Sequence, residues 1–390
     1  LFVLDDGWFG ERNDDYRGLG DWYPNTNKLP RGISGLSKKV NDLGLNFGLW
    51  IEPEMVNKDS ELYRNYPDWI ISTPNRSDSH GRNQYVLDFS RHEVVDYIHE
   101  MISKVLRESN ISYIKWDMNR SITECYSIAY PADQQGEIFH RYILGVYDLY
   151  ERLTSAFPEV LFESCASGGG RFDPGMLYYA PQGWVSDDSD AVERLKIQYG
   201  TSMCYPLSSM GSHVSVIPNH QVFRNTPLHT RANVAYFGTF GYELDLNKLS
   251  DAEIEEVKAQ IRFMKEYREL LQFGTFYRLK SPFDGNETVW MVVSEDKSKA
   301  LVGYYRVLNG VNLPYSCVKL QGLDPDKLYE NELANTEHYG DELMNLGLIT
   351  TDVSAGEVPQ GAEPCTDFES RIYLLKEKQS RCIGAETVSK

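Results

Sequence analysis

Residues 91–117 read RHEVVDYIHEMISKVLRESNISYIKWD, and they combine two patterns that indicate the fold class. A short apolar run over 113–117 ends on Asp117, which is typical of a buried strand with a polar end. Between residues 91 and 108, the apolar side chains recur on one face of a helix: Val94, Val95, Ile98, Met101, Ile102 and Val105. A helix followed by such a strand is typical of folds in which strands and helices alternate along the chain.

The same alternation extends in both directions along the chain. Strands are predicted over 2–6, 46–52, 113–117, 160–164, 183–188, 208–216 and 240–244. Helices are predicted over 33–44, 91–108, 134–155, 190–203 and 227–237, and a last one begins at a Ser250–Glu253 capping box. A closed barrel has eight strand–helix units, and this chain has seven and begins at Leu1. The sequence therefore predicts an α/β fold, a (β/α)8 TIM barrel whose first βα unit is missing.

The pattern changes from about residue 275. Apolar runs at 288–293 and 300–305 flank a polar turn, which predicts an antiparallel hairpin, and 371–375 predicts a late strand. We therefore predict a catalytic barrel over 1–274 that holds strands 2–8. A small antiparallel β-sandwich domain over 275–376 and a flexible tail over 377–390 are predicted to follow it.

Composition excludes several classes of partner. The net charge of −18 argues against nucleic acid and anionic membrane surfaces, which require a basic patch. No apolar run approaches the roughly 20 residues that cross a bilayer. The six cysteines form no CxxC pair, which predicts a reducing, cytoplasmic location, although a chain without its native start says nothing about a leader. The eight histidines form no HExxH motif, so no metal site and no cofactor are predicted.

Acidic residues gather where the predicted strands end. In a TIM barrel these ends form the rim that carries the active site. Such a collection is rarely accidental, because buried carboxylates are costly unless they are paired or hydrogen bonded. The residues at the predicted rim are Asp5, Asp6, Glu52, Glu54, Asp117, Glu163, Asp187 and Asp188.

Lys115, Asp117 and Asn119 project to one side of their predicted strand, because side chains alternate along a strand. A cation two positions from a carboxylate favours the ionised form that a glycosidase nucleophile needs. The spacing is equally consistent with a salt bridge in the barrel core between Lys115 and an acidic neighbour, so both interpretations stay open.

Asp187 and Asp188 suggest a complementary role. Adjacent carboxylates repel each other, and a poorly solvated one acquires the raised pKa that suits a general acid. The alternative, slightly favoured by the sequence alone, is that this segment only caps a helix, with Asp188, Ser189 or Asp190 as the cap.

The glycine-rich run over 163–171, ESCASGGGR, follows a strand. It lacks the Walker pattern of a phosphate cradle, so close backbone approach to a neutral ligand is the better interpretation. Cys165 has no basic partner nearby and is interpreted as a small contact residue. Trp50 and Trp184 offer rings for stacking on a sugar, although core packing is the commoner use of a single Trp.

Five motifs together resemble glycoside hydrolase family 36, the α-galactosidases of the microbial type. They occur in the family's order and spacing across about residues 1–275, and the C-terminal β-domain fits as well. The motifs are LDDGWFG (4–10), GLWIEPE (48–54), KWDMNR (115–120), CASGGGR (165–171) and SDDSDA (186–191).

The resemblance implies a retaining mechanism with Asp117 as the nucleophile and Asp187 as the general acid/base. Their carboxyl groups are then expected about 5–5.5 Å apart. It also implies that Asp5 and Asp6 bind the 4- and 6-hydroxyls and that Cys165 and Gly168 face the 2-hydroxyl. The remaining implied sugar contacts are Trp50, Arg82, Lys115 and Asn119. The implied substrates are α-galactosides such as melibiose and raffinose.

Compared with the family, the chain is expected to lack a large N-terminal β-sandwich and the first barrel strand. Full-length members of the family are implied to be homo-tetramers. Three rival functions stay open: a galactosyltransferase of the raffinose-synthase type, a non-catalytic sugar-binding protein on the same scaffold, and a metal-dependent hydrolase. The presence of both Asp117 and Asp187 argues against the binding protein.

Overall fold

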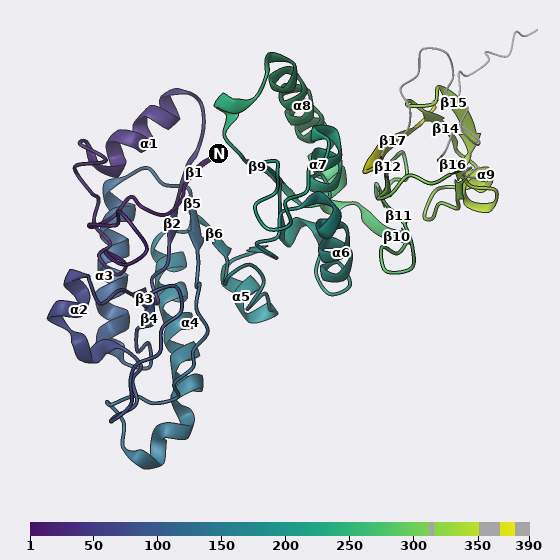
Figure 1. The fold of residues 1–390 in the computed structure, drawn as a ribbon. Helices are drawn as coiled ribbons and strands as arrows, with labels where there is room; N and C mark the ends of the chain where they lie inside the picture. Colours follow the sequence, from purple (N-terminus) through teal and green to yellow (C-terminus); the bar gives the residue numbers. More distant parts are fainter. Residues whose placement is uncertain (312–315, 351–366, 379–390) are drawn as a thin grey trace, which may run out of the picture. The chain divides into compact units, whose positions relative to one another are not determined.

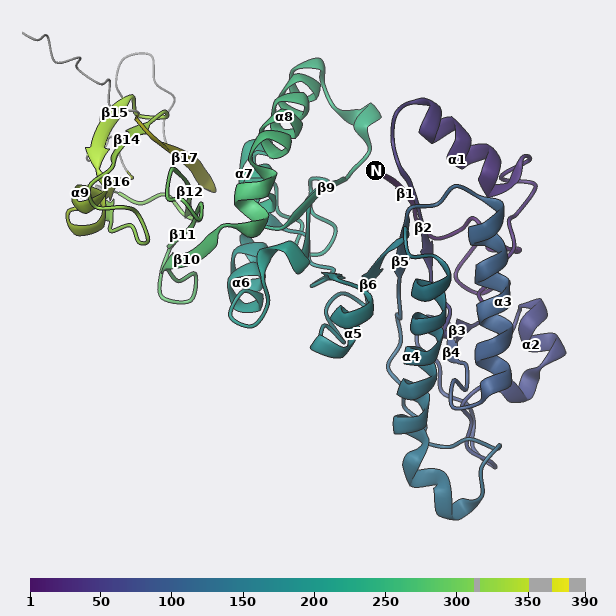
Figure 2. The ribbon, with the colours of Figure 1, turned by 180° about the vertical axis from the view of Figure 1, so that it is seen from behind.

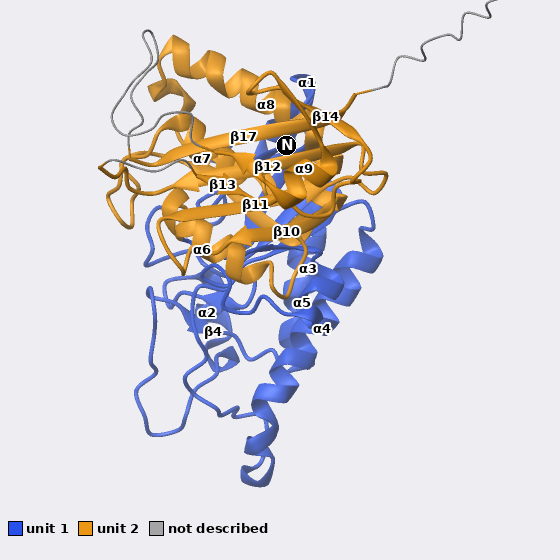
Figure 3. Ribbon diagram, turned by 90° about the vertical axis from the view of Figure 1, so that its right-hand side faces the viewer, with its two compact units in different colours: residues 1–187 blue, residues 188–390 orange. Residues whose placement is uncertain are grey.

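The chain divides into two units, residues 1–187 and 188–390 (Figure 3). The computed structural model describes residues 1–311, 316–350 and 367–378. Each unit has its own set of strands and helices.

Five parallel strands form the sheet of the first unit (Figure 1). Each is hydrogen bonded to the next, and the helices lie between them in sequence. The strands are β1 (Phe2–Leu4), β2 (Phe47–Ile51), β5 (Tyr113–Trp116), β6 (Leu161–Ser164) and β7 (Gln182–Trp184). The helices are α1 (Gly32–Asp42), α3 (His92–Glu108), α4 (Ile138–Ala156) and α5 (Pro174–Tyr179).

The helix predicted over 91–108 is confirmed as α3. Val94, Ile98 and Ile102 are all buried, as the helical spacing of the apolar residues predicts. Helices α3 and α4 contact each other and run side by side (Figures 1 and 2). All five residues of β2 are buried, as expected for a parallel strand that is covered on both faces.

The segment between β2 and α3 is an excursion from the strand–helix repeat. It contains a short antiparallel pair, β3 (Met55–Val56) with β4 (Tyr85–Val86), and the helix α2 (Glu61–Asn65). A 3-10 turn at Pro67–Trp69 follows α2. Gln84, in this excursion, donates to Glu52 directly after β2, so this part of the excursion lies at the edge of the sheet where β2 ends.

The second unit opens with more strand–helix structure. Strands β8 (Met210–Ser215) and β9 (Thr239–Glu243) are parallel neighbours. Strand β8 follows the helix α6 (Ala191–Thr201), β9 follows the helix α7 (Leu228–Ala235), and α8 (Asp251–Phe273) comes after β9. The capping box predicted at the start of α8 is confirmed, with Ser250 and Glu253 bonded reciprocally. Short 3-10 turns lie at Leu207–Ser209 and Leu246–Lys248.

An antiparallel sheet of six strands completes the second unit. The predicted hairpin is confirmed, because β11 pairs with β12. In spatial order the strands are β10 (Thr275–Lys280), β11 (Glu287–Val293), β12 (Lys299–Arg306), β17 (Glu369–Glu377), β14 (Leu328–Asn331) and β15 (Thr336–Tyr339). A two-stranded sheet of β13 (Cys317–Val318) and β16 (Leu348–Ile349) and the helix α9 (Gly340–Asn345) accompany it.

The α/β alternation followed by antiparallel structure confirms the predicted fold class. The domain boundaries at 274 and 376 stay predictions; β17 itself runs to Glu377, and residues 379–390 of the predicted tail lie outside the described residues. Within the described part of the chain, no helix is both long and apolar enough to cross a bilayer.

Candidate active site

The ends of β2, β5 and β6 bring polar residues into register. Trp50 pairs with Lys115, and Lys115 pairs with Glu163 on the next strand. Because parallel strands end at the same edge of their sheet, the segments that follow these residues also meet there. Those segments carry Asp117 and Cys165, two of the residues predicted for the site.

Asp117 is held by three hydrogen-bond donors. Its Oδ2 accepts from Trp50 Nε1 at 3.2 Å and from Asn119 Nδ2 at 2.7 Å, and its Oδ1 accepts from the backbone N–H of Met118 at 2.8 Å. The side chain is buried, with 6% of the residue exposed. Asn119 lies on the same side as Asp117, as the alternation of side chains predicts. These contacts fix the carboxylate in one orientation at the strand end.

Lys115 forms its ion pair with Asp5, with 3.3 Å between Nζ and Oδ2. Burial lowers the pKa of Lys115, but the negative charges of Asp5, Glu163 and other neighbours outweigh it and raise the pKa above its ordinary value. Asp117 is one of those charges. The Lys115 ammonium thus has both surroundings that the sequence left open, a salt bridge to an acidic neighbour and the field of Asp117.

Asp6 has a partner that the sequence analysis missed. Arg12 donates from Nε and Nη2 to the Asp6 carboxylate at 2.8–3.2 Å, which is a two-pronged contact. The Arg12 side chain is 5% exposed, and its Nη1 also donates to Asn57 Oδ1 at 3.2 Å. No periodic pattern links residues six apart in a loop, so the sequence offered no signal for this pair.

Asp187 and Trp184 form the other end of the site. Trp184 Nε1 donates to Asp187 Oδ1 at 3.2 Å. Burial, and then the negative charge of Asp117, raise the pKa of Asp187 above its ordinary value. Asp187 does not cap the following helix, because the cap of α6 is Asp190, whose side chain accepts from the backbone N–H groups of Val192 and Glu193.

Gly168 allows the glycine-rich loop to approach the Asp187 segment. Its φ of +82° is accessible to glycine, and a Cβ at this position would lie 2.7 Å from the backbone nitrogen of Asp187. The neighbouring Ser167 hydroxyl donates to Asn119 Oδ1 at 3.3 Å. Burial and then the charge of Asp117 raise the pKa of Cys165, so its thiol is neutral and unsuited to nucleophilic attack.

Glu52 is fully buried beside these residues. Its Oε1 accepts from the backbone N–H of Asn119, and its Oε2 accepts from Gln84 Nε2 at 2.9 Å. Burial, and then the charge of Asp117, raise the pKa of Glu52 to about 8, against the opposing effects of Asn119 and Arg82. Arg82 itself is exposed, with a φ of +52°, and its charge lowers the pKa of Asp187 as well as that of Glu52.

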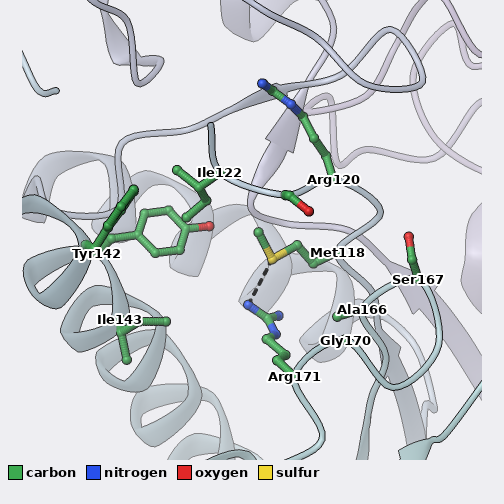
Figure 4. Close-up of a pocket in the computed structure, with 11 residues that line it drawn as sticks. Met118, Arg120, Ile122, Tyr142, Ile143, Ala166, Ser167, Gly170 and Arg171 are labelled. Carbon is green, nitrogen blue, oxygen red and sulfur yellow. Dashed lines mark hydrogen bonds between the residues drawn. The ribbon is translucent and has the colours of Figure 1, made fainter. Parts of the chain in front are cut away.

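A separate cavity of about 380 Å³ lies next to this segment (Figure 4). Met118 lines it and contacts Arg171, while Tyr142 and Ile143 line it from α4 (Figure 4). Side chains alternate along an extended segment, so Met118 points away from the side that carries Asp117. Among the described residues, no group of three or more His, Cys, Asp or Glu side chains is placed to hold a metal ion.

Two carboxylates at strand ends of a parallel sheet, one oriented by donors and the other with a raised pKa, form the arrangement expected of a glycoside hydrolase. The chain belongs to the melibiase family, whose model matches residues 1–274. A second model, the glycosyl hydrolase family 36 C-terminal domain, matches residues 287–375.

Individual relatives agree with this family. The chain is 60% identical to the α-galactosidase AgaA of Geobacillus stearothermophilus over 97% of its own length and 50% of that enzyme. It is 51% identical to the α-galactosidase Mel36A of Lactobacillus acidophilus over 96% and 50% of the two chains. The crystal structure of AgaA superposes with a TM-score of 0.92 at 56% identity, covering 96% of this chain and 51% of AgaA. The chain therefore spans about half the length of the curated relatives it matches.

Proposed function

We propose that the protein is a retaining α-galactosidase that removes terminal α-galactose from oligosaccharides such as melibiose and raffinose. The observation that carries the proposal is the contrast between Asp117, oriented by three donors, and Asp187, whose pKa is raised. The 60% identity to an α-galactosidase supports it, as do crystal structures of AgaA variants in complex with raffinose and with stachyose.

In the proposed mechanism, Asp117 attacks the anomeric carbon of the galactosyl group, and Asp187 gives its proton to the departing glycosidic oxygen. The bond to the aglycone breaks, and a galactosyl ester forms on Asp117. Asp187, now ionised, then takes a proton from water, whose oxygen displaces Asp117 and releases galactose with its original configuration. The hydrogen bond from Trp184 orients the Asp187 carboxyl for both proton transfers.

Recognition of galactose is proposed for the residues around this pair. Asp5 and Asp6 are proposed to bind the 4- and 6-hydroxyls, and Lys115 and Arg12 orient these two carboxylates. Arg82 and Asn119 are proposed to make the remaining polar contacts, with Trp50 as a wall. Cys165 and Gly168 are proposed to face the 2-hydroxyl, where they leave little room for a larger substituent.

The stereochemical course tests the mechanism. Proton NMR during hydrolysis of a nitrophenyl α-galactoside is expected to show α-galactose first, with β-galactose appearing only by mutarotation. Initial release of β-galactose would contradict the retaining mechanism. Product analysis at high acceptor concentration separates hydrolysis from galactosyl transfer, and binding of galactose without any turnover would indicate a sugar-binding protein.

The two carboxylates are tested separately. Asp117→Ala is expected to lower kcat by at least about a thousandfold on every substrate. Asp187→Ala is expected to lower kcat by about 10²–10⁴-fold on melibiose, and by less on a nitrophenyl galactoside whose leaving group needs no proton. Asp42→Asn is the control, because Asp42 is an exposed carboxylate at the end of α1 that pairs with Lys38, and wild-type turnover is expected.

We also propose that the full-length protein acts in the cytoplasm and assembles as a homo-tetramer. Four cysteines among the described residues are free thiols, which supports a reducing compartment: Cys125, Cys165, Cys204 and Cys317. Fractionation of the native host tests the location, and light scattering coupled to size-exclusion chromatography tests the subunit number. A monomer at micromolar concentration would contradict the assembly.

A further inference from the structure

Glu52 joins two segments that both reach the candidate site. One is the extended segment after β5, which carries Asn119, and the other is the turn over 81–84, which carries Arg82. Glu52 bonds the first through the Asn119 backbone N–H and the second through Gln84 Nε2. The turn is closed by the Gln84 N–H donating to the Gly81 carbonyl at 2.9 Å. A single buried side chain thus holds two loops together.

This contact leads directly to the proposed nucleophile. Asn119, fixed by Glu52 through its backbone, donates from its side chain to Asp117 Oδ2 at 2.7 Å. Asn119 is also restrained by the Ser167 hydroxyl at 3.3 Å. Glu52 is 0% exposed and Gln84 is 2% exposed, so water does not compete for these hydrogen bonds. Displacement of Asn119 would therefore be transmitted to the Asp117 carboxylate.

We propose that Glu52 is a positioning residue for the reaction: it holds Asn119 against Asp117 and fixes the turn that carries Arg82. The inference rests on the proposed function, because it assigns Glu52 a part in the same site. Glu52 itself makes no bond to substrate. Its contribution is geometric, and small displacements of reacting groups reduce rates steeply.

Removal of the acceptor and its conservative replacement have different expected effects. Glu52→Ala leaves the Asn119 N–H and the Gln84 amide without an acceptor. Glu52→Gln keeps a carbonyl oxygen for the Asn119 N–H, and its new amide meets the Gln84 amide. Gln84 Oε1 is buried and has no hydrogen-bond partner among the residues that the structure describes, so the Gln84 amide can turn over and accept from the new amide without losing a bond.

The experiment compares kcat, KM, galactose affinity and thermal stability in wild type, Glu52→Ala and Glu52→Gln. Glu52→Ala is expected to lower kcat by about a hundredfold, with a smaller change in KM, and to weaken galactose binding about tenfold. Glu52→Gln is expected to stay within about threefold of wild type in kcat, KM and galactose affinity. Galactose binding is read from tryptophan fluorescence, because Trp50 lies beside Asp117.

Asp21→Ala is the control for a purely structural loss. Asp21 is a buried carboxylate in the same unit that holds the backbone N–H groups of Glu61 and Leu62 at 2.9 and 3.0 Å. The Asp21→Ala variant is expected to have a lower melting temperature than wild type and an unchanged kcat. The same pattern in folded Glu52→Ala, a lowered melting temperature with wild-type kcat, would overturn the proposal.

The variants also separate this inference from the proposed function. If wild type binds galactose but turns over no α-galactoside, the proposed activity fails, and the galactose affinities still judge Glu52. If Glu52→Ala does not fold, Glu52→Gln decides: turnover and affinity near wild type support positioning through hydrogen bonds. A folded Glu52→Gln that has lost both would overturn it, because the amide retains the acceptor that positioning requires.

Discussion

Glu52 and Glu54 lie two residues apart after the same strand and are both fully buried, yet their surroundings are opposite. The two terminal nitrogens of the Arg171 guanidinium donate to the two carboxylate oxygens of Glu54, at 2.9 and 2.5 Å. It also accepts from Trp116 Nε1 at 2.8 Å and from the Tyr142 hydroxyl. Among the described residues, the donors to Glu52 are amides, and Glu52 lies close to the like charge of Asp117.

The comparison shows that burial alone does not determine how a carboxylate behaves. Glu54 has a cation in direct contact, so it serves as a structural anchor that ties β5, α4 and the glycine-rich loop together. Glu52 lacks such a contact, and its pKa rises to about 8. Below that pH Glu52 is a neutral acid, so it adds no second negative charge beside that of Asp117.

The largest expected effect comes from removing the charge of Glu54. Glu54→Gln leaves Arg171 buried without its counter-charge, so we expect the free energy of unfolding to fall by about 3–5 kcal/mol. Urea unfolding followed by far-ultraviolet circular dichroism measures it. Glu108→Gln, at an exposed position of α3, is the control and is expected to change stability by less than about 0.5 kcal/mol. A loss of similar size in both variants would contradict the anchor.

The pH dependence of the free energy of unfolding is expected to show that Glu52 is protonated in the folded protein below its raised pKa. A carboxyl whose folded pKa is raised from 4.5 to about 8 contributes stability fully at low pH and loses it as the pH rises through that window. Glu52→Gln cannot ionise, so it is expected to gain stability relative to wild type between pH 5 and pH 8.5, by about 2–5 kcal/mol. Parallel pH profiles of the two proteins would show that Glu52 is ionised in the folded state throughout.

Tyr142→Phe tests the anchor with a smaller change. It removes one of the donors to Glu54 and keeps the ring, so a loss of about 1.5–3 kcal/mol is expected for a hydrogen bond to a charged group. Tyr178→Phe, at a side chain that is 78% exposed, serves as the control in the same denaturation assay. If Tyr142→Phe were as stable as the control, Arg171 and Trp116 alone would satisfy Glu54.

The smallest effect is expected at Gln84. Gln84→Met removes one neutral donor from Glu52 and keeps a side chain of similar length, so we expect a loss of about 1 kcal/mol at pH 6, where Glu52 is protonated. The loss is expected to grow above pH 8, because an ionised Glu52 depends more on its donors. A loss that is the same at both pH values would contradict the assigned protonation of Glu52.

Local patterns predicted much of this molecule correctly. The helical spacing of Val94, Ile98 and Ile102 predicted α3, and the alternation of residues predicted that Asn119 lies on the side of Asp117. The cap of α6 was among the alternatives that the sequence left open, and the structure places it at Asp190. These features follow from one or two adjacent elements, whose periods are written in the sequence.

The contacts that the sequence analysis missed all join residues whose spacing follows no such period. Arg12 donates to Asp6, six residues earlier in a loop, and Trp184 donates to Asp187, three residues later. Gln84 donates to Glu52, 32 residues earlier in the chain. Sequence alone also predicted roles for the sugar contacts only through the family resemblance. Those roles stay predictions.

The sequence therefore specified the strand–helix order, the acidic strand ends and the family, because each depends on local period or on motif identity. The tertiary structure alone distinguished Glu52 from Glu54, gave Asp6 its arginine and placed the Trp184 indole against Asp187. The physical reason is that the energy of a buried charge depends on the distance and sign of its neighbours, and these neighbours come from strands and loops far apart in the chain.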